Sequence, residues 1–363
     1  MHITLIAGAR PNFIKIAPLI HAIQQAQKEG KEIVYRLVHT GQHYDKNMSD
    51  TFFEELNIPA PDANLGCGGG SQAEQTAAIM VAFEKELIAH PTDLVLVVGD
   101  VTSTMACSIV AKKLNTKVTH VEAGIRSWDL TMPEEINRMV TDCLADFYFT
   151  TSEVANQNLR NAGVTEDRIH FVGNVMIDTL RANENRFNKP NVFDELSLQE
   201  GKYIVMTLHR PANVDEADKL RDLVNQITQN VQDEPIVFPI HPRTARIFKD
   251  LGIHAKNLYT IDPLGYLEFN YLVKHARAVV TDSGGITEET TVMGVPCITL
   301  RDNTERPETC TIGTNELIGT DPKNIAPALQ TLYAGNWKKG AIPPLWDGHT
   351  SERIVEILLQ KYV

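Results

Sequence analysis

The sequence lacks paired cysteines, metal-binding spacings and long apolar runs. Its five cysteines are scattered, with no C-x-x-C pair and no histidine spacing suited to zinc: Cys67, Cys107, Cys143, Cys297 and Cys310. We therefore expect reduced thiols and no bound metal. No apolar run approaches the ~20 residues that span a bilayer, and the segment after Met1 is too short for a signal peptide. These absences predict a cytoplasmic protein with no membrane partner.

An excess of basic residues is also missing. The formal net charge is -12 at pH 7, from 34 Lys and Arg against 46 Asp and Glu. A broad positive field that would gather nucleic acid is therefore excluded, and any anionic ligand must be held locally. With 43% hydrophobic and 22% charged residues, the composition is typical of a globular protein. The 363 residues exceed one ordinary hydrophobic core, which predicts two domains.

What is present is a repeated order of strand, loop and helix. An apolar run at 3–7 leads through the turn Gly8-Ala9-Arg10-Pro11 into a helix-period pattern over 14–23. Further strands are predicted at 32–38, 93–98, 117–121, 147–150 and 169–172, and, after a polar stretch at 183–201, at 203–208, 235–240, 258–261, 278–282 and 297–300. This order predicts an α/β fold of two Rossmann-like, doubly wound parallel-sheet domains, at 1–172 and 173–350. Ligands of such folds bind at the carboxyl ends of the strands, so we expect the two domains to face a central cleft.

The most informative motif of the second half is Ser283-Gly284-Gly285, which joins a predicted strand to a helix. Such a helix N-terminus presents free N–H groups and the positive end of the dipole, which suits a phosphate or diphosphate. The two glycines permit close approach of the backbone, and the serine adds a hydroxyl donor. Glu289 lies one to two turns further on, where a carboxylate accepts from ribose hydroxyls in dinucleotide folds. The alternative for Ser-Gly-Gly alone is a plain glycine N-cap.

The loop after the first strand offers cations rather than a glycine fingerprint. Neither G-x-G-x-x-G nor G-x-x-x-x-G-K-[ST] occurs in the sequence, and we expect no cofactor. Arg10 and Lys15 are interpreted as contacts of a diphosphate, with solvated surface charges as the alternative. Arg306, after a later strand, supplies a further cation on the phosphate side.

Three acids stand at or near strand ends. Asp100 follows one strand, Glu122 follows the next, and Glu134 opens a helix. Crowded carboxylates raise one another's pKa, an arrangement typical of proton transfer, although Asp100 alone is also explained as a loop cap and Glu134 as a first-turn charge. His209, at another strand end, is a candidate phosphate donor or proton shuttle. For His241 a structural role is equally plausible.

Taken together, these motifs resemble the non-hydrolysing UDP-N-acetylglucosamine 2-epimerase family, which has the glycosyltransferase-B architecture. The resemblance spans nearly the whole chain and includes Gly8-Ala9-Arg10-Pro11, His39-Thr40-Gly41-Gln42-His43, Val98-Gly99-Asp100, His120-Val121-Glu122-Ala123-Gly124-Ile125-Arg126, Pro133-Glu134-Glu135 with Asn137-Arg138, His209-Arg210, Asp282-Ser283-Gly284-Gly285 with Glu288-Glu289, and Thr304-Glu305-Arg306-Pro307-Glu308. It implies a homodimer that acts on a UDP-sugar, with a C-terminal helix at 351–361 that packs back on the first domain.

The resemblance also implies a reaction. UDP-N-acetylglucosamine would lose UDP and its C2 proton to give 2-acetamidoglucal, and re-addition would give UDP-N-acetylmannosamine. Asp100, Glu122 and Glu134 carry over as acid, base and cation-stabilising groups, without an assignment of each acid to a face of C2. His209 joins them in the catalytic site as a pyrophosphate contact. The implied substrate-binding residues are Arg10, Lys15, Arg138, Ser283, Gly284, Gly285, Glu289 and Arg306.

Two segments depart from the family pattern. The family's His-Arg-x-Glu-Asn stands here as His209-Arg210-Pro211-Ala212-Asn213, and 64–72 is unusually rich in glycine. In bacterial members a second, activating nucleotide-sugar site lies near positions equivalent to Gln42, His43 and Gln72, so the departure bears on allosteric control and on the exact sugar. The alternatives are an epimerase of a related UDP-2,3-diacetamido or deoxy sugar, a UDP-sugar glycosyltransferase of the same fold, and a non-catalytic nucleotide-sugar sensor.

Overall fold

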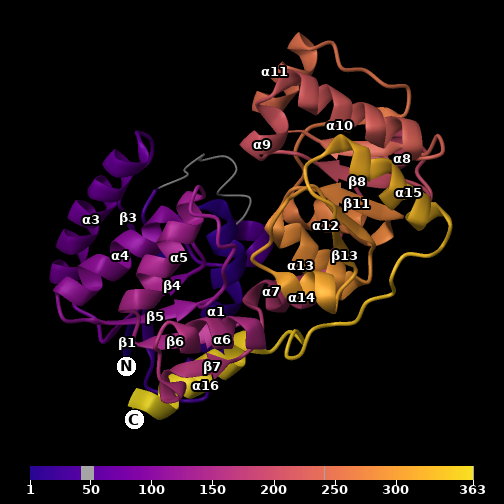
Figure 1. Cartoon of the computed structure of the whole chain (residues 1–363). Coiled ribbons are helices and arrows are strands. Elements are labelled where there is room, and N and C mark those ends of the chain that lie inside the picture. Colours follow the sequence, from indigo (N-terminus) through magenta and orange to yellow (C-terminus); the bar gives the residue numbers. More distant parts are fainter. Residues whose placement is uncertain (42–52, 241, 363) are drawn as a thin grey trace. The chain divides into compact units, whose positions relative to one another are not determined.

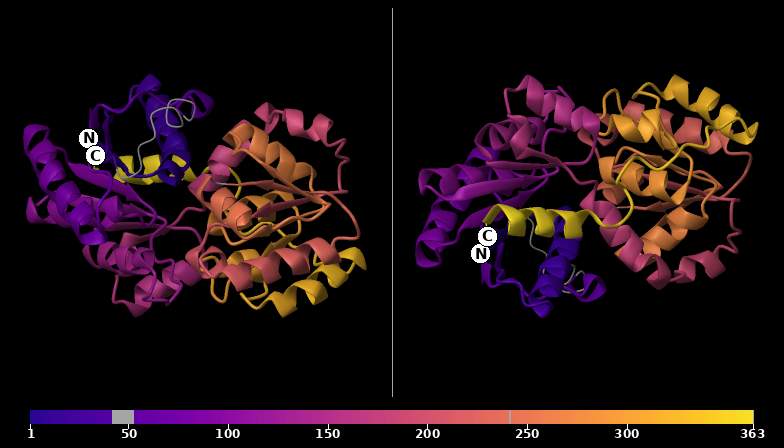
Figure 2. Two further views of the ribbon diagram at one scale, coloured as in Figure 1. Left: turned by 90° about the horizontal axis from the view of Figure 1, so that it is seen from above. Right: turned by 90° about the horizontal axis from the view of Figure 1, so that it is seen from below.

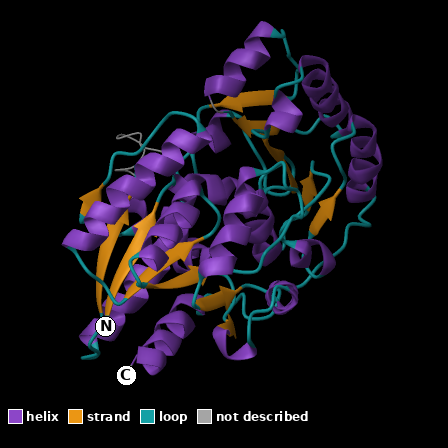
Figure 3. Ribbon diagram, turned by 60° about the vertical axis from the view of Figure 1, so that its left-hand side comes forward, coloured by secondary structure: helices purple, strands orange, loops and turns teal. Residues whose placement is uncertain are grey.

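The computed structural model describes residues 1–41, 53–240 and 242–362, apart from the side chains at 10, 11, 211, 212, 242, 243 and 362. The chain divides into two compact units (Figure 1): unit 1 is Met1–Ala182 with Pro344–Val363, and unit 2 is Asn183–Pro343. Each unit is a parallel sheet flanked by helices (Figure 3). Among the described residues, no helix combines the length and apolar character that crossing a membrane requires.

Unit 1 contains a sheet of seven strands in the order β3-β2-β1-β4-β5-β6-β7. The strands are β1 (His2–Ala7), β2 (Val34–His39), β3 (Ala63–Asn64), β4 (Leu94–Val98), β5 (Lys117–Val121), β6 (Phe147–Thr150) and β7 (Ile169–Phe171). The helices are α1 (Arg10–Lys28), α3 (Gln72–Ala89), α4 (Thr102–Lys113), α5 (Pro133–Leu144), α6 (Glu153–Asn161), α7 (Val175–Asn183) and α16 (Thr350–Tyr362). A 3-10 turn, η1 (Glu166–Arg168), precedes β7. Every strand pair is parallel, so the carboxyl ends of all strands share one edge.

Local chemistry explains the main elements of unit 1. All five residues of β4 are apolar and buried, because helices cover both faces of a parallel sheet. Helix α3 begins with a capping box, in which Ser71 Oγ accepts from Glu74 N at 3.3 Å and Glu74 Oε2 accepts from Ser71 N at 2.8 Å. Helix α16, the last of the chain, packs beside α1, the first (Figure 2).

Unit 2 repeats the architecture with six parallel strands in the order β10-β9-β8-β11-β12-β13. The strands are β8 (Ile204–Thr207), β9 (Ile236–Pro239), β10 (Leu258–Ile261), β11 (Ala278–Thr281), β12 (Cys297–Thr299) and β13 (Asn315–Leu317). The helices are α8 (Asn191–Glu195), α9 (Pro211–Val214), α10 (Ala217–Asn230), α11 (Pro242–Asp250), α12 (Tyr266–His275), α13 (Gly284–Met293), α14 (Pro307–Thr311) and α15 (Ile325–Tyr333). Two 3-10 turns complete it, η2 (Glu184–Arg186) and η3 (Pro322–Asn324). Gly294 ends α13 with a φ of +72°, the left-handed cap that glycine accepts without a steric penalty.

The predicted pair of doubly wound parallel sheets is confirmed. The segments predicted as strands became β1, β2 and β4 to β12, which include the edge strands β7 and β10. The edge strands β3 and β13 were not predicted, because neither Ala63–Asn64 nor Asn315–Leu317 forms an apolar run. Helix α3 also carries no clean apolar stripe, since it buries Ile79, Phe83 and Leu87 but exposes Val81 and Ile88.

Candidate functional site

Two of the predicted acids stand at adjacent strand ends of unit 1. Val98 of β4 pairs with Val121 of β5, and Gly99 N donates to the Val121 carbonyl at 3.0 Å. Asp100 and Glu122 therefore follow neighbouring strands at the same edge of the sheet. Glu122 is buried, whereas a quarter of the Asp100 side chain is exposed.

Glu122 is held by a lysine from the first helix. Lys15 Nζ lies 2.6 Å from Glu122 Oε2, and both side chains are buried. Asn12, one turn earlier in α1, accepts from Gly8 N and Ala9 N at 3.1 Å and donates to the Val98 carbonyl at 3.0 Å. Asn12 thus fixes the start of α1 against the end of β4. Lys15, predicted as a diphosphate contact, is placed against a catalytic candidate.

The backbone at this edge is unusual in two places. Gly99 has a φ of +70°, and Glu122 has a φ of +68° although it is not glycine. A Cβ on Gly99 would lie 3.2 Å from Lys15 Nζ and 3.5 Å from Glu122 Oε2. Non-glycine residues in this region cluster at functional sites, because the surrounding structure must hold them there.

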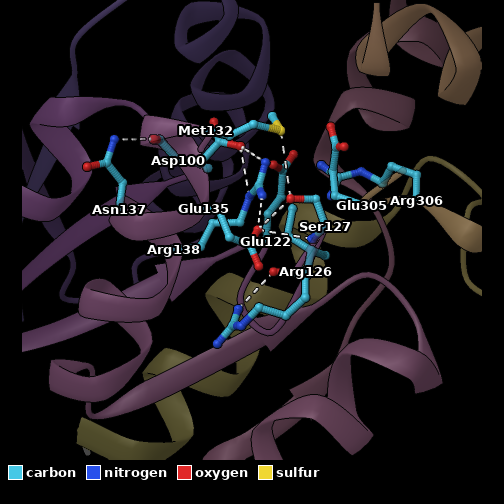
Figure 4. A network of polar contacts seen from close by, with 12 residues as sticks. Asp100, Glu122, Arg126, Ser127, Met132, Glu135, Asn137, Arg138, Glu305 and Arg306 are labelled. Carbon is cyan, nitrogen blue, oxygen red and sulfur yellow. Dashed lines mark hydrogen bonds and ion pairs between the residues drawn. The ribbon is translucent and has the colours of Figure 1, made fainter. Parts of the chain in front are cut away.

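Asp100 is held by an arginine of α5. Arg138 donates to Asp100 Oδ2 from Nε at 3.1 Å and from Nη2 at 2.8 Å, and its Nη1 pairs with Glu135 (Figure 4). Glu135 also accepts from Ser127 N, Ser127 Oγ and Trp128 N, each at 3.0 Å. Arg138, predicted as a substrate contact, is buried between these two carboxylates.

Glu134 and Glu135 face different surroundings. Glu134 is exposed on the first turn of α5, whereas Glu135 is fully buried. Successive residues of a helix point about 100° apart, so only one of the pair faces the interior. The sequence analysis named Glu134 and did not consider Glu135. The signal that could have found Glu135 is its spacing of three residues from Arg138, which places both on one face of the helix.

In unit 2, the Ser-Gly-Gly motif forms the predicted helix N-terminus. Ser283 is the N-cap of α13, and Gly284 and Gly285 are its first residues. A Cβ on Gly284 would lie 2.7 Å from Glu305 Oε1, so the backbone there packs directly on the Arg301–Glu305 ion pair, whose Nη2 and Oε2 are 2.7 Å apart. A side chain at this position would therefore displace the Glu305 carboxylate.

Asp282 follows β11 and links the end of that strand to the end of β8. It is buried, and it accepts from the backbone N–H groups of His209 and Arg210 and from Asn213 Nδ2. Burial alone would raise the pKa of Asp282, but the hydrogen bonds and the His209 ring hold it below its usual value. His209 Nδ1 lies 2.7 Å from Asp282 Oδ1, while 57% of the side chain is exposed. The carboxylate therefore orients the ring through one nitrogen and leaves most of the imidazole accessible.

Glu289 lies inside α13, with its carboxyl group shielded from solvent. Tyr266 OH donates to Glu289 Oε1 at 2.9 Å, and both residues are buried. Burial raises the pKa of Glu289 to about 7, despite the hydrogen bond from Tyr266. Arg306, predicted as a substrate-side cation, is buried and paired with Glu288. Tyr266 was not predicted, because nothing in the local sequence connects α12 to α13.

Several predicted positions fall outside these clusters. The side chain of Arg10 and residues Gln42, His43 and His241 lie outside the described part of the chain. Gln72 is exposed at the start of α3, where its Oε1 accepts from Thr102 Oγ1 at 3.3 Å. Within the described residues, no group of three or more His, Cys, Asp and Glu side chains is arranged to hold a metal ion.

Comparison with known proteins places this arrangement in a family. A family model described as UDP-N-acetylglucosamine 2-epimerase matches residues 25–359. A UDP-N-acetylglucosamine 2-epimerase of Methanocaldococcus jannaschii is 40% identical, over 99% of this chain and 99% of that protein. The chain belongs to the UDP-N-acetylglucosamine 2-epimerase family.

A family member named for a different sugar has the same identity to this chain. The UDP-2,3-diacetamido-2,3-dideoxy-D-glucuronate 2-epimerase of Pseudomonas aeruginosa is 40% identical, over 99% of both chains. The crystal structure of the Methanocaldococcus jannaschii UDP-GlcNAc 2-epimerase in complex with UDP-GlcNAc and UDP matches with a TM-score of 0.89, over 99% of this chain and 100% of that one. The chain is therefore an enzyme of the epimerase family, with its two-sheet fold.

Proposed function

We propose that this epimerase interconverts UDP-N-acetylglucosamine and UDP-N-acetylmannosamine by elimination and re-addition of UDP. A base removes the C2 proton, the electrons of the C2–H bond form the C1=C2 double bond, and the C1–O bond breaks with its electron pair leaving on UDP. The reverse addition, with the proton delivered to the other face of C2, gives the epimer. Asp100, Glu122 and Glu134 are the candidate acid, base and cation-stabilising groups.

The buried Lys15–Glu122 ion pair carries this proposal. A carboxylate at a strand end, held by a cation at 2.6 Å in a left-handed backbone, has a fixed position for proton transfer. Asp100 follows the neighbouring strand β4 and is paired with Arg138. Two independently held carboxylates suit a reaction that removes a proton from one face and returns it to the other.

Unit 2 supplies the features expected of a UDP site. The N-terminus of α13 offers N–H groups for the diphosphate, and the exposed His209 ring is positioned by Asp282. Glu289 is proposed to accept from the ribose hydroxyls. Arg10 is proposed as a further pyrophosphate contact from its place at the start of α1.

The second candidate substrate is a UDP-2,3-diacetamido sugar. The relatives named for the two sugars share the same 40% identity with this chain. We favour UDP-N-acetylglucosamine because the solved relative with a TM-score of 0.89 holds that sugar nucleotide. A direct comparison of turnover on both sugar nucleotides decides between them.

The decisive experiment follows hydrogen at C2. The protein is incubated with UDP-N-acetylglucosamine in heavy water, and the C2 position is monitored by NMR. Elimination and re-addition exchange the C2 proton for deuterium and build up the C2 epimer. A glycosyltransferase or a nucleotide-sugar sensor would leave the C2 proton in place, and that result would contradict the proposal.

We further propose that the enzyme works as a homodimer. Helix α3 exposes Val81 at 56% and Ile88 at 62%, two large apolar side chains on one helix. The two residues are seven apart and so lie on the same side of α3, where they could join an apolar contact with a partner. A second copy of the chain is the partner that the family resemblance implies.

A further inference from the structure

A buried polar cluster lies behind the two catalytic carboxylates of unit 1. His120, in β5, is fully buried, and Asp142 of α5 and Arg126 are also buried. His120 Nδ1 lies 2.6 Å from Asp142 Oδ1, and His120 Nε2 lies 2.9 Å from the Gly99 carbonyl oxygen. The ring therefore bridges α5 and the loop that carries Asp100.

The partners of the ring determine which of its nitrogens carry hydrogen. A carbonyl oxygen can only accept, so His120 Nε2 donates to Gly99. Asp142 Oδ2 faces two donors, Arg126 Nη1 at 2.6 Å and Gly124 N at 3.0 Å, so Asp142 is an ionised carboxylate. Burial would raise the pKa of Asp142, but the charges and hydrogen bonds of His120 and Arg126 keep it lowered. Asp142 Oδ1 must then accept as well, and the ring donates from both nitrogens as an imidazolium.

The two ends of the bridge lie next to the catalytic positions. Gly99 immediately precedes Asp100, and Gly124, whose N–H donates to Asp142, lies two residues after Glu122. Both Gly99 and Glu122 have a positive φ, which glycine adopts freely but which Glu122 keeps only because surrounding contacts fix it. One imidazolium thus holds the backbone beside both carboxylates.

We propose that His120 is a positioning residue for the epimerisation, which acts by donating to the Gly99 carbonyl and to Asp142 and thereby sets where the Asp100 and Glu122 carboxylates stand. This inference rests on the proposed function. In this role His120 does not contact the substrate. Replacement of His120 should therefore lower turnover and leave the affinity for UDP intact.

The first test is made on the free, wild-type protein. Nitrogen-15 NMR of the labelled histidine rings is assigned to His120 by the signal that disappears in His120→Asn. We expect hydrogen on both ring nitrogens, because both partners of the ring accept. A ring nitrogen without hydrogen would overturn the inference, and this measurement requires neither activity nor a stable variant.

The second test separates the two ends of the bridge. His120→Gln places an amide donor near the Nε2 position and keeps a donor for Gly99, whereas His120→Asn places it near Nδ1 and loses that contact. We expect kcat to fall by about 100-fold in His120→Asn and by about 10-fold in His120→Gln, because small misplacements of reacting groups carry costs of this size. KM and the UDP dissociation constant should stay within about 2-fold of wild type. The matched control is His170→Gln, in the edge strand β7, which should keep full turnover.

The outcomes are distinguishable from a failure of the proposed function. Wild-type protein that exchanges C2 hydrogen, together with full turnover in His120→Asn, would overturn this inference alone. Absence of exchange in the wild type would overturn the proposed function and this inference with it. Equal losses of kcat in His120→Asn and His120→Gln would contradict the role of the Gly99 contact.

Discussion

Glu122 combines three features that seldom meet in one side chain. It follows a buried strand, it adopts a φ of +68°, and its carboxylate lies 2.6 Å from the amine of Lys15. The backbone conformation costs a non-glycine residue on the order of 1 kcal/mol, which the ion pair and the flanking strand must offset. The fold therefore holds the Glu122 carboxylate in one place at a cost in the free energy of folding.

Replacement of Glu122 by glutamine tests that placement. The amide keeps the shape but cannot take a proton, so kcat should fall by about 100-fold, the scale of a lost acid or base. The UDP dissociation constant, measured by titration calorimetry, should remain close to wild type. Glu86→Gln is the matched control, since Glu86 is also paired, with Arg36 at 2.7 Å, but stands away from the strand ends. Unchanged turnover in Glu122→Gln would remove this residue from the reaction.

Two buried carboxyls of unit 2 make stability depend on pH. Burial raises the pKa of Glu289 and of Glu308 to about 7, from an ordinary value of 4.5. The folded state then binds more protons than the unfolded state between these values, so the free energy of unfolding falls as pH rises from 4.5 to about 7. For each group the difference corresponds to roughly 3 kcal/mol at most.

Glu289→Gln should reduce this pH dependence, because the amide does not titrate. Thermal unfolding followed from acid to neutral pH measures the slope in the wild type and in the variant. The residual slope should decrease further when Glu308→Gln is added. A slope identical in wild type and in the double variant would contradict the raised pKa values.

At the scale of elements, the buried carboxylate of Asp178 binds the start of the C-terminal helix α16. Asp178 of α7 accepts from Thr350 N at 3.0 Å, and from Ser351 N and Ser351 Oγ at 2.6 Å. These bonds cap the start of α16, while Trp346 Nε1 donates to the Thr151 carbonyl at 2.9 Å just before it. Segments more than 170 residues apart in the sequence are thereby joined.

Asp178→Ala should loosen α16 selectively. It leaves two backbone donors at the helix start without their carboxylate, a loss of about 1 to 3 kcal/mol. Hydrogen exchange measured by mass spectrometry should show faster exchange in α16 than in the wild type. Glu352→Ala, an exposed substitution in the first turn of the same helix, is the control. Equal protection of α16 in Asp178→Ala and wild type would show that the cap contributes nothing.

At the scale of the whole molecule, the chain is two similar parallel-sheet units with a net charge of -12. With a charge of that sign, the binding of any anionic ligand would depend on local cations and helix dipoles. Each unit has its own buried core, which holds its own sheet in place.

If the protein is a homodimer through α3, substitutions on that helix should lower its mass in solution. Val81→Asp combined with Ile88→Asp puts two charges on the exposed apolar side of α3, and it should convert a dimer into a monomer in light scattering after size-exclusion chromatography. Val154→Asp, at an apolar position of α6 that is 49% exposed, should leave the mass unchanged. A double variant with the wild-type mass would exclude this side of α3 as the interface.

The sequence determined most of the strands of this protein and the strand-end positions of two candidate acids, Asp100 and Glu122. Apolar runs bounded by glycine are local signals, and they were sufficient to place Asp100 and Glu122 after neighbouring strands and Ser283 before a helix. The motif pattern also indicated the family, because its spacing extends over most of the chain.

Only the tertiary structure decided which side chains meet. Lys15 pairs with Glu122, which is 107 residues later in the sequence. His120 contacts both Gly99 and Asp142, and Tyr266 of α12 donates to Glu289 of α13. The choice of Glu135 rather than Glu134 for the interior depended on how α5 is rotated against the sheet. The physical reason is the same in each case. Crossover connections of a parallel sheet bring distant segments to one edge, and the pairing of charges there depends on packing that no local pattern records.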